Sequence, residues 1–160
     1  MTPSLHSAPP AQANASKPLV QQRGDYRYFR EITTRWMDND VYGHVNNVIY
    51  YSWFDTVVNG WLLEHDLLDF QTCPTIGLVV ETQCSYLSSI AFPDRVCGGL
   101  RVARLGTSSV RYEVGLFAND SGQASAQGHF VHVYVDRLSR RPVPLPHRLR
   151  QALETLEVTP

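Results

Sequence analysis

Apolar and polar residues alternate with a period of two in five segments of the chain, at residues 26–36, 75–86, 95–104, 108–117 and 124–136. Such alternation is typical of strands in an antiparallel sheet with one covered face. Turn-forming residues separate the later segments, as at Pro93-Asp94 and at residues 119–122. The pattern therefore predicts five antiparallel strands.

Residues 47–64, between the first two strand segments, follow a helical period instead. Their apolar residues form a stripe that nearly encircles the helix, with Tyr50, Trp53, Phe54, Val57, Val58, Trp61 and Leu62 at its centre. A helix this apolar has to be buried on several sides. A second, short helix is predicted over residues 146–157.

The order of these elements is strand, long helix, four strands, short helix, which places the chain in the α+β class. A curved five-stranded antiparallel sheet wrapped around the long helix is the expected architecture, because only a concave sheet face can cover such a helix. This sheet has two unpaired edges. Pairing the sheets of two copies edge to edge would remove them, so we expect at least a homodimer.

The first 24 residues differ from the rest, with four of the ten prolines and no aromatic residue. We expect residues 1–24 to form a disordered tail and residues 25–160 to form one folded domain. An organelle-import peptide is the alternative for this tail, although its prolines oppose the amphipathic helix that such a peptide needs.

The charge and the cysteine content exclude several classes of partner and binding site. The formal net charge is -1 and no basic stripe is present, so a nucleic-acid partner is not expected. No apolar run is long enough for a membrane span, so no membrane partner is expected either. The three cysteines show no CxxC spacing. They indicate reduced thiols and a cytoplasmic protein rather than a disulfide framework or a zinc site, and no cofactor is implied.

Candidate chemistry gathers in the polar turn before the long helix. The turn holds two carboxylates, Asp38 and Asp40, and continues through Gly43 and His44 to Asn46 and Asn47. Taken singly, these residue types are common in turns and helix caps. Together they place a candidate base beside the free N–H groups of a helix start, which favour negative charge developing on an oxygen. Hydrolysis of an acyl group needs this arrangement.

The segment RWMDNDVYGHVNNVIYY, residues 35–51, resembles the signature of the hot-dog-fold acyl-CoA thioesterases of the hydroxybenzoyl-CoA thioesterase-like group. Later segments, such as GLVVE at residues 77–81 and FVHV at residues 130–133, resemble the strand pattern of that family. The resemblance covers about residues 25–136. It implies a hot-dog fold, a homo-oligomer that is a homotetramer if it is not a homodimer, and an acyl-CoA substrate that is hydrolysed to a free acid and CoA.

The resemblance assigns roles by position. The catalytic carboxylate of the family corresponds to Asp40, as nucleophile or as general base for water, and residue type alone does not choose between these roles. The backbone N–H that polarises the thioester carbonyl corresponds to Asn47. Asp38 is the alternative catalytic carboxylate, although we favour a role in stabilising the turn for it. For His44, a catalytic role and a structural role are given equal weight.

Further candidates for contact with the substrate are Asn46, Tyr50 and Glu81. Asn46 is expected to cap the helix, Tyr50 lines an acyl tunnel or belongs to the core, and Glu81 faces an acyl site of the neighbouring subunit or forms a salt bridge. The alternatives to an acyl-CoA thioesterase are a thioesterase for acyl carrier protein and a non-catalytic acyl-binding module. A hot-dog hydratase is disfavoured because its aspartate-and-histidine motif is absent. His129 and His132 are expected on opposite faces of one strand, which argues against a shared metal.

Overall fold

The computed structural model describes residues 19–69 and 71–158. This part of the chain forms the strands β1 (Tyr28–Thr33), β2 (Thr75–Tyr86), β3 (Arg95–Leu105), β4 (Ser109–Ala118) and β5 (Ala126–Asp136), and the helices α1 (Asn47–Glu64) and α2 (His147–Glu154). Short 3-10 turns lie at Arg23–Asp25 and Trp36–Asp38. The bounds of α1 and β2 are the predicted ones.

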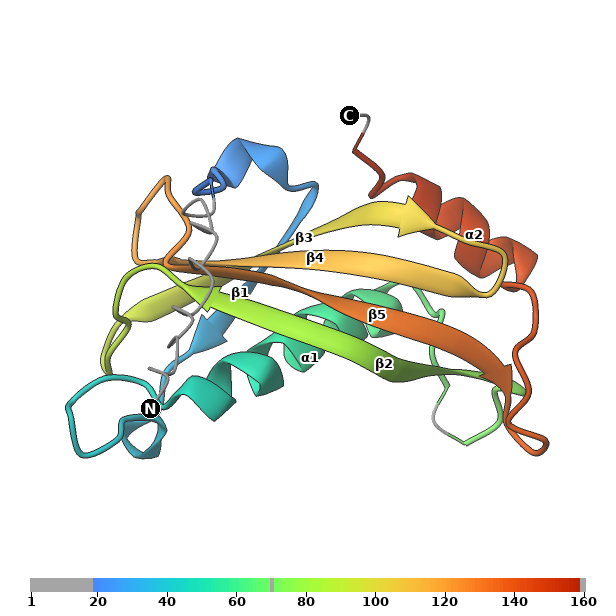
Figure 1. The fold of residues 1–160 in the computed structure, drawn as a ribbon, viewed down its shortest axis with the longest axis horizontal. Helices are drawn as coiled ribbons and strands as arrows, with labels where there is room; N and C mark the ends of the chain where they lie inside the picture. Colours follow the sequence, from blue (N-terminus) through green and yellow to red (C-terminus); the bar gives the residue numbers. More distant parts are fainter. Residues whose placement is uncertain (1–18, 70, 159–160) are drawn as a thin grey trace, which may run out of the picture.

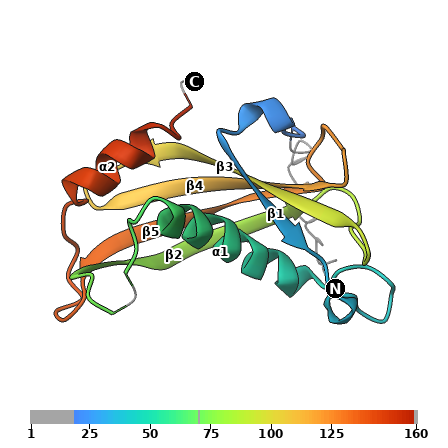
Figure 2. The ribbon, with the colours of Figure 1, turned by 180° about the vertical axis from the view of Figure 1, so that it is seen from behind.

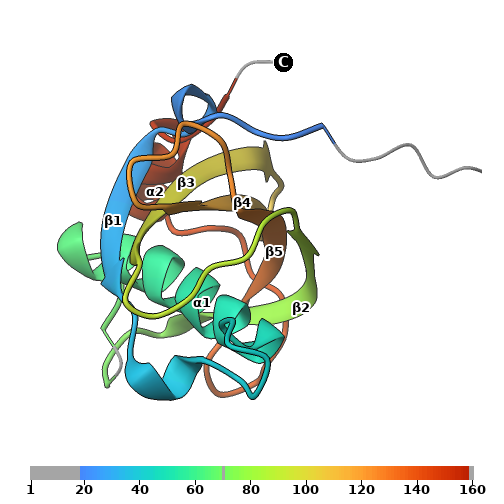
Figure 3. The same cartoon turned by 90° about the vertical axis from the view of Figure 1, so that its left-hand side faces the viewer.

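The five strands form one sheet in the order β1-β3-β4-β5-β2, and every neighbouring pair is antiparallel. The sheet curves from β1 round to β2 with α1 inside the curve (Figure 3). Helix α2 lies near the β3–β4 end of the sheet (Figure 1). The predicted curved sheet around one long helix is therefore confirmed, and so is the short C-terminal helix.

The core lies between α1 and the concave face of the sheet. Phe54, Val57 and Val58 of α1 are fully buried there, and each such side chain contributes roughly 1.5–3 kcal/mol by leaving water. The helix comes close to the sheet backbone at two glycines. A Cβ atom on Gly98 would lie 2.3 Å from Val57 Cγ2, and one on Gly128 would lie 2.8 Å from Phe54 Cε2. These glycines let the large helix side chains reach the sheet.

The structure corrects several predicted boundaries, and β1 and β5 start at Tyr28 and Ala126 rather than at residues 26 and 124. The first strand ends at Thr33, not at residue 36, because the chain turns at Trp36–Asp38 and leaves Trp36 81% exposed. The second helix begins at His147 and ends at Glu154. It is therefore shorter at both ends than the predicted span of residues 146–157.

The expected tail is only partly covered by the described residues. Residues 1–18 lie outside them. Residues 19–24 are described and lie against the β4–β5 connection, where Ala124 N donates to Gln21 O (3.0 Å) and Arg23 N donates to Gly122 O (2.9 Å). Within the described residues, Gln21 and Arg23 are therefore bonded to the rest of the fold on the N-terminal side of Asp25.

The two ends of α1 lie in different surroundings. The polar turn before α1 and the β2–β3 connection lie at one end of the molecule (Figure 1). The segment that follows α1 and the start of β2 lie at the other end, as the view from behind also shows (Figure 2). The candidate catalytic residues in the polar turn therefore lie at the same end of the molecule as the β2–β3 connection.

Candidate active site

The polar turn is closed by backbone hydrogen bonds around Gly43. Asp40 N donates to His44 O (2.8 Å), and Gly43 N donates to Asp40 O (3.1 Å). Gly43 has a φ of 81°, in the left-handed region that glycine adopts without strain. A β-bridge between Asn39 and Val45 completes the bend. This geometry brings the Asp40 carboxylate back toward the start of α1.

The two carboxylates of the turn have different surroundings. The Asp38 side chain is fully buried and accepts hydrogen bonds from Arg35 Nη2 (2.8 Å), Arg35 Nε (3.0 Å) and Arg35 N (2.8 Å). Asp40 is half-buried, and one of its oxygens, Oδ1, accepts from Tyr42 N (2.8 Å). Among the described residues, nothing donates to the other oxygen of Asp40. Asp38 is therefore engaged by the bend, whereas Asp40 keeps a free carboxylate oxygen.

The start of α1 offers an N–H group to the same region. Asn46 is the N-cap, as predicted, and its Oδ1 accepts from Val48 N (3.2 Å). Asn47 is the first residue of the helix, and within the described part of the chain no carbonyl accepts from its N–H. Unpaired N–H groups at a helix start carry partial positive charge. Asn47 N can therefore stabilise an oxygen that becomes negative.

These groups share one open pocket, which we call the turn pocket. It has a volume of about 340 Å³ and is lined by Asp40, His44, Val45, Asn47, Tyr50, Tyr86, Leu87, Ser88 and Ser89. Tyr86 of β2 donates through its hydroxyl to Asn47 O (3.1 Å), and its ring packs edge-on against Tyr50 at 5.0 Å between centroids. The end of β2 is thus attached to the start of α1. Burial raises the pKa of both tyrosines, so their hydroxyls stay protonated at neutral pH.

The structure brings four of the sequence candidates together in the turn pocket: Asp40, His44, Asn47 and Tyr50. The His44 side chain is exposed and makes no hydrogen bond to a described residue. Tyr50 is 3% exposed and packs on Trp53, so it belongs to the core as well as to the pocket wall. Asp38 and Asn46 lie beside the pocket and hold the bend and the helix start.

Glu81 lies elsewhere, on the outer face of the sheet. Its Oε1 is 2.7 Å from His129 Nε2 and 3.6 Å from Arg111 Nη1. The next residue after His129, Phe130, packs inward on Phe54 at 5.7 Å, so His129 and Glu81 face away from α1. Within this chain, Glu81 is a salt-bridged strand residue.

Sequence reasoning did not identify Tyr86, Ser88 and Ser89 as walls of the pocket. These residues are distant in sequence from the turn, and only the pairing of β2 with β5 at the edge of the sheet brings them to it. An aromatic residue at the end of the β2 pattern was the available signal. It did not specify which element the ring would meet.

No group of three or more His, Cys, Asp or Glu side chains in residues 19–69 and 71–158 is placed to hold a metal ion. None of the helices described has the length and apolar character needed to cross a membrane.

The curved sheet around one long helix, with a free carboxylate beside the first N–H groups of that helix, defines a hot-dog-fold protein with a hydrolytic type of site. The family model of the Thioesterase-like superfamily matches residues 34–153. The chain belongs to this superfamily and is a thioester hydrolase.

Solved structures agree with this assignment. The PA5185 protein of Pseudomonas aeruginosa strain PAO1 is 53% identical, with a TM-score of 0.84 over 87% of this chain and 97% of that chain. A thioesterase of Thermus thermophilus, complexed with coenzyme A and Zn, is 30% identical, with a TM-score of 0.70 over 85% of this chain and 98% of that chain. The 1,4-dihydroxy-2-naphthoyl-CoA thioesterase Slr0204 of Synechocystis is 18% identical, with a TM-score of 0.72 over 79% and 94% of the two chains, and shares the fold.

Proposed function

We propose that this protein hydrolyses acyl-CoA thioesters to a free acid and CoA, with Asp40 as the catalytic carboxylate. The observation that carries the proposal is the turn pocket, where the free oxygen of Asp40 and the unpaired N–H of Asn47 line the same space. The coenzyme A bound to the Thermus thermophilus relative supports CoA as the carrier of the acyl group.

The geometry supports a simple division of roles. The thioester carbonyl oxygen accepts a hydrogen bond from Asn47 N, which stabilises the negative charge that forms on this oxygen. As a general base, Asp40 takes a proton from water while the water oxygen bonds to the carbonyl carbon. The C–S bond then breaks, and the CoA thiolate leaves and takes up a proton. As a nucleophile, Asp40 attacks the carbonyl carbon, the C–S bond breaks and CoA leaves as the thiolate, which takes up a proton; water then hydrolyses the resulting anhydride to the free acid and regenerates the Asp40 carboxylate.

His44 adds a third polar group to the proposed site. Its exposed ring lies on the pocket wall, and its backbone is joined to that of Asp40 by the hydrogen bond from Asp40 N to His44 O (2.8 Å). We assign it the orientation of water or of the thioester. In this role, replacing the ring with glutamine would lower kcat less than the loss of the Asp40 charge.

We also propose that the active unit is a dimer formed through β2. This strand is the last in the sheet and pairs only with β5 among the described strands. It carries three consecutive apolar residues, Leu78, Val79 and Val80, with exposures of 38%, 47% and 61%. Two β2 strands related by a twofold axis would run antiparallel. The Tyr86 end of one strand, which lies at the turn pocket, would then meet the Thr75 end of the other.

From the cysteine content we place the enzyme in the cytoplasm.

The turnover of Asp40→Asn tests the proposed function. The variant keeps the size of the side chain and removes the charge, so hydrolysis of a panel of short, medium, long and aromatic acyl-CoAs should fall by roughly 10²–10⁴. Asp120→Asn, at a side chain that is 95% exposed, is the control and should keep full activity. Unchanged turnover in Asp40→Asn would refute the assignment. If the protein hydrolyses only thioesters of acyl carrier protein, its substrate is an acylated carrier protein and not an acyl-CoA. If it binds acyl groups without hydrolysis, it is an acyl-binding module.

A further inference from the structure

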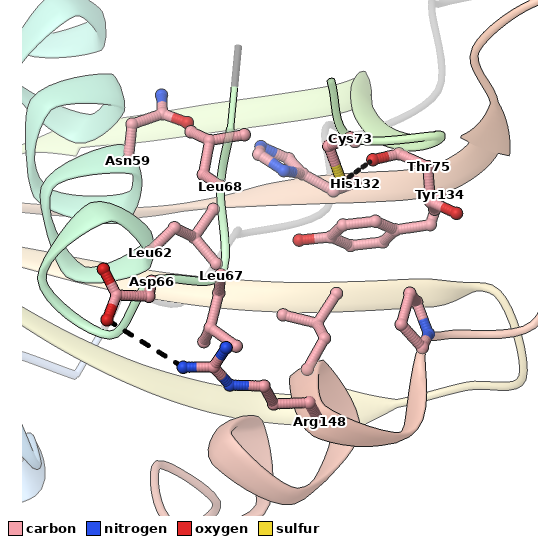
Figure 4. Close-up of a pocket in the computed structure, with 13 residues that line it drawn as sticks. Asn59, Leu62, Asp66, Leu67, Leu68, Cys73, Thr75, His132, Tyr134 and Arg148 are labelled. Atoms are coloured by element: carbon pink, nitrogen blue, oxygen red, sulfur yellow. Dashed lines mark hydrogen bonds and ion pairs between the residues drawn. The ribbon is translucent and has the colours of Figure 1, made fainter. Parts of the chain in front are cut away.

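A second cavity lies at the opposite end of α1 from the turn pocket, and we call it the distal cavity. It has a volume of about 170 Å³. Its walls come from the end of α1, the segment after α1, the strands β2 and β5, and α2, and include Leu62, Leu67, Leu68, His132, Tyr134 and Leu149 (Figure 4). It shares no lining residue with the turn pocket. Within one chain the two spaces are therefore separate.

His132 is an unusual component of this mainly apolar wall. The residue is 4% exposed, yet neither of its ring nitrogens has a hydrogen-bond partner among the protein atoms described. Aromatic rings surround it, with Tyr112 at 5.1 Å and Phe130 at 6.0 Å between centroids. Buried polar atoms are nearly always partnered in native proteins, because an unpartnered one loses its bonds to water without replacement. The unpaired ring nitrogens indicate a position for a ligand.

The protonation of His132 limits the ligand. Burial lowers the pKa of the ring to about 4, so the imidazole is neutral at pH 7. It then has one N–H donor and one nitrogen acceptor. The ring offers no charge to an anion. The Arg148 guanidinium at the mouth lies 4.0 Å from the Asp66 carboxylate, and both groups are largely exposed. An uncharged ligand suits this cavity.

Tyr134 supplies a second polar group beside His132. Its hydroxyl lies 2.8 Å from the hydroxyl of Tyr112, and one of these two O–H groups donates to the other. Tyr112 is fully buried, so the arrangement in which Tyr112 donates satisfies its hydrogen inside the core. The hydrogen of Tyr134 is then free to point into the distal cavity. The rings of His132 and Tyr134, 6.4 Å apart between centroids, both line the cavity (Figure 4).

We propose that the distal cavity binds a small, uncharged and mainly apolar molecule that carries one hydroxyl group, as a phenol does. The hydroxyl lies between His132 and Tyr134, where it donates to the unprotonated ring nitrogen and accepts from the tyrosine O–H. The apolar body contacts the leucines of the wall. The phenol test does not depend on the proposed hydrolysis, because the cavity has no lining residue in common with the turn pocket of the same chain.

Titration of the full chain with phenol and with toluene tests the proposal. The two probes have nearly the same shape, but only phenol has the hydroxyl. We expect saturable binding of phenol that shifts the ¹⁵N resonances of the His132 ring, and at least tenfold weaker binding of toluene. Benzoate, which carries a charge, should not bind. Equal binding of phenol and toluene, or no saturable binding of phenol, would overturn the proposal.

Two variants separate the ligand site from a structural effect. His132→Phe keeps an aromatic ring and removes both nitrogens, so it should abolish the preference for phenol, while His147→Phe, at an exposed histidine, should keep it. Leu68→Trp fills the distal cavity from the segment after α1 and leaves His132 in place, so it should block phenol binding even if the first variant folds poorly. Phenol binding that survives in Leu68→Trp, with the same shifts at His132, would also refute the proposed site.

Discussion

Arg35 holds the buried carboxylate of Asp38, with Nη2 and Nε at 2.8 Å and 3.0 Å from the same oxygen. The backbone carbonyl of Asp38 in turn accepts from Asn46 N (2.8 Å), the N-cap of α1. Asp38 thus connects the end of the first strand segment with the start of the helix. The carboxylate two residues later is left to face the turn pocket, and the two acids can be told apart by experiment.

Asp38→Asn should lower stability and spare turnover. The substitution replaces charge-assisted bonds with neutral ones and points an amide N–H₂ at a guanidinium, which costs about 1–3 kcal/mol. Urea denaturation at pH 7 measures this loss, and kcat per folded molecule should stay within a few-fold of wild type. Asp120→Asn, on an exposed aspartate, should lie within about 0.5 kcal/mol of wild type. If Asp38→Asn instead loses turnover as severely as Asp40→Asn and keeps its stability, the roles of the two acids are reversed.

The sequence predicted the parts of the fold that depend on local periodicity. Helix α1 could be bounded because Asn46 caps its start and because its apolar stripe is long and uninterrupted. The first strand was extended too far because Trp36 continued the alternation. The bond between Arg35 and Asp38 turns the chain there, and no periodic pattern reveals such a bond between side chains.

Only those residues of the candidate site that lie close together in the sequence could be predicted to lie close together in space. Asp40, Gly43, His44 and Asn47 lie within one turn, so their proximity follows from spacing. Tyr86 comes to the pocket through the order of the strands, which depends on packing across the whole sheet. The sequence also could not predict that the ring nitrogens of His132 lack hydrogen-bond partners, because the alternation indicated only that His132 and His129 point to opposite faces of the strand.

The free edge of β2 leads to an expectation about assembly. Val80→Asp places a charge at the most exposed of the three apolar residues on this edge, and charged edge residues oppose strand pairing between molecules. Light scattering at micromolar concentration should give a dimer or larger for the wild type and a monomer for Val80→Asp. Leu138→Asp, at an apolar residue that is 91% exposed outside the strands, is the matched control and should keep the wild-type mass. A monomeric wild type would rule out a site shared between subunits.

Gly128 tests the close approach of α1 to the sheet. A Cβ atom here would lie 2.0 Å from Gln83 O and 2.8 Å from Phe54 Cε2, so Gly128→Ala has to displace the β2 backbone or the helix. We expect a loss of roughly 1–3 kcal/mol or more in unfolding free energy. Gly122→Ala is the control, since no atom lies within 4 Å of the added methyl group. A neutral result for Gly128→Ala would show that β5 and β2 separate easily at this point.

His132 should make stability depend on pH in the acidic range. Its pKa is about 4 in the folded protein against an ordinary value of 6.5, because burial disfavours the charged ring. Between these values the unfolded chain binds a proton that the folded chain does not, so stability falls as the pH drops from 6.5 toward 4. A pKa shift of this size corresponds to about 3 kcal/mol of unfolding free energy over the whole range.

Urea denaturation at about pH 7.5, 5.5 and 4.5 should show a shallower pH dependence for His132→Phe than for the wild type. Comparing the two proteins cancels the contributions of the carboxylates that both share, and His147→Phe should keep the wild-type slope. If His132→Phe also keeps that slope, the ring of His132 accepts a proton in the folded protein as readily as in the unfolded chain.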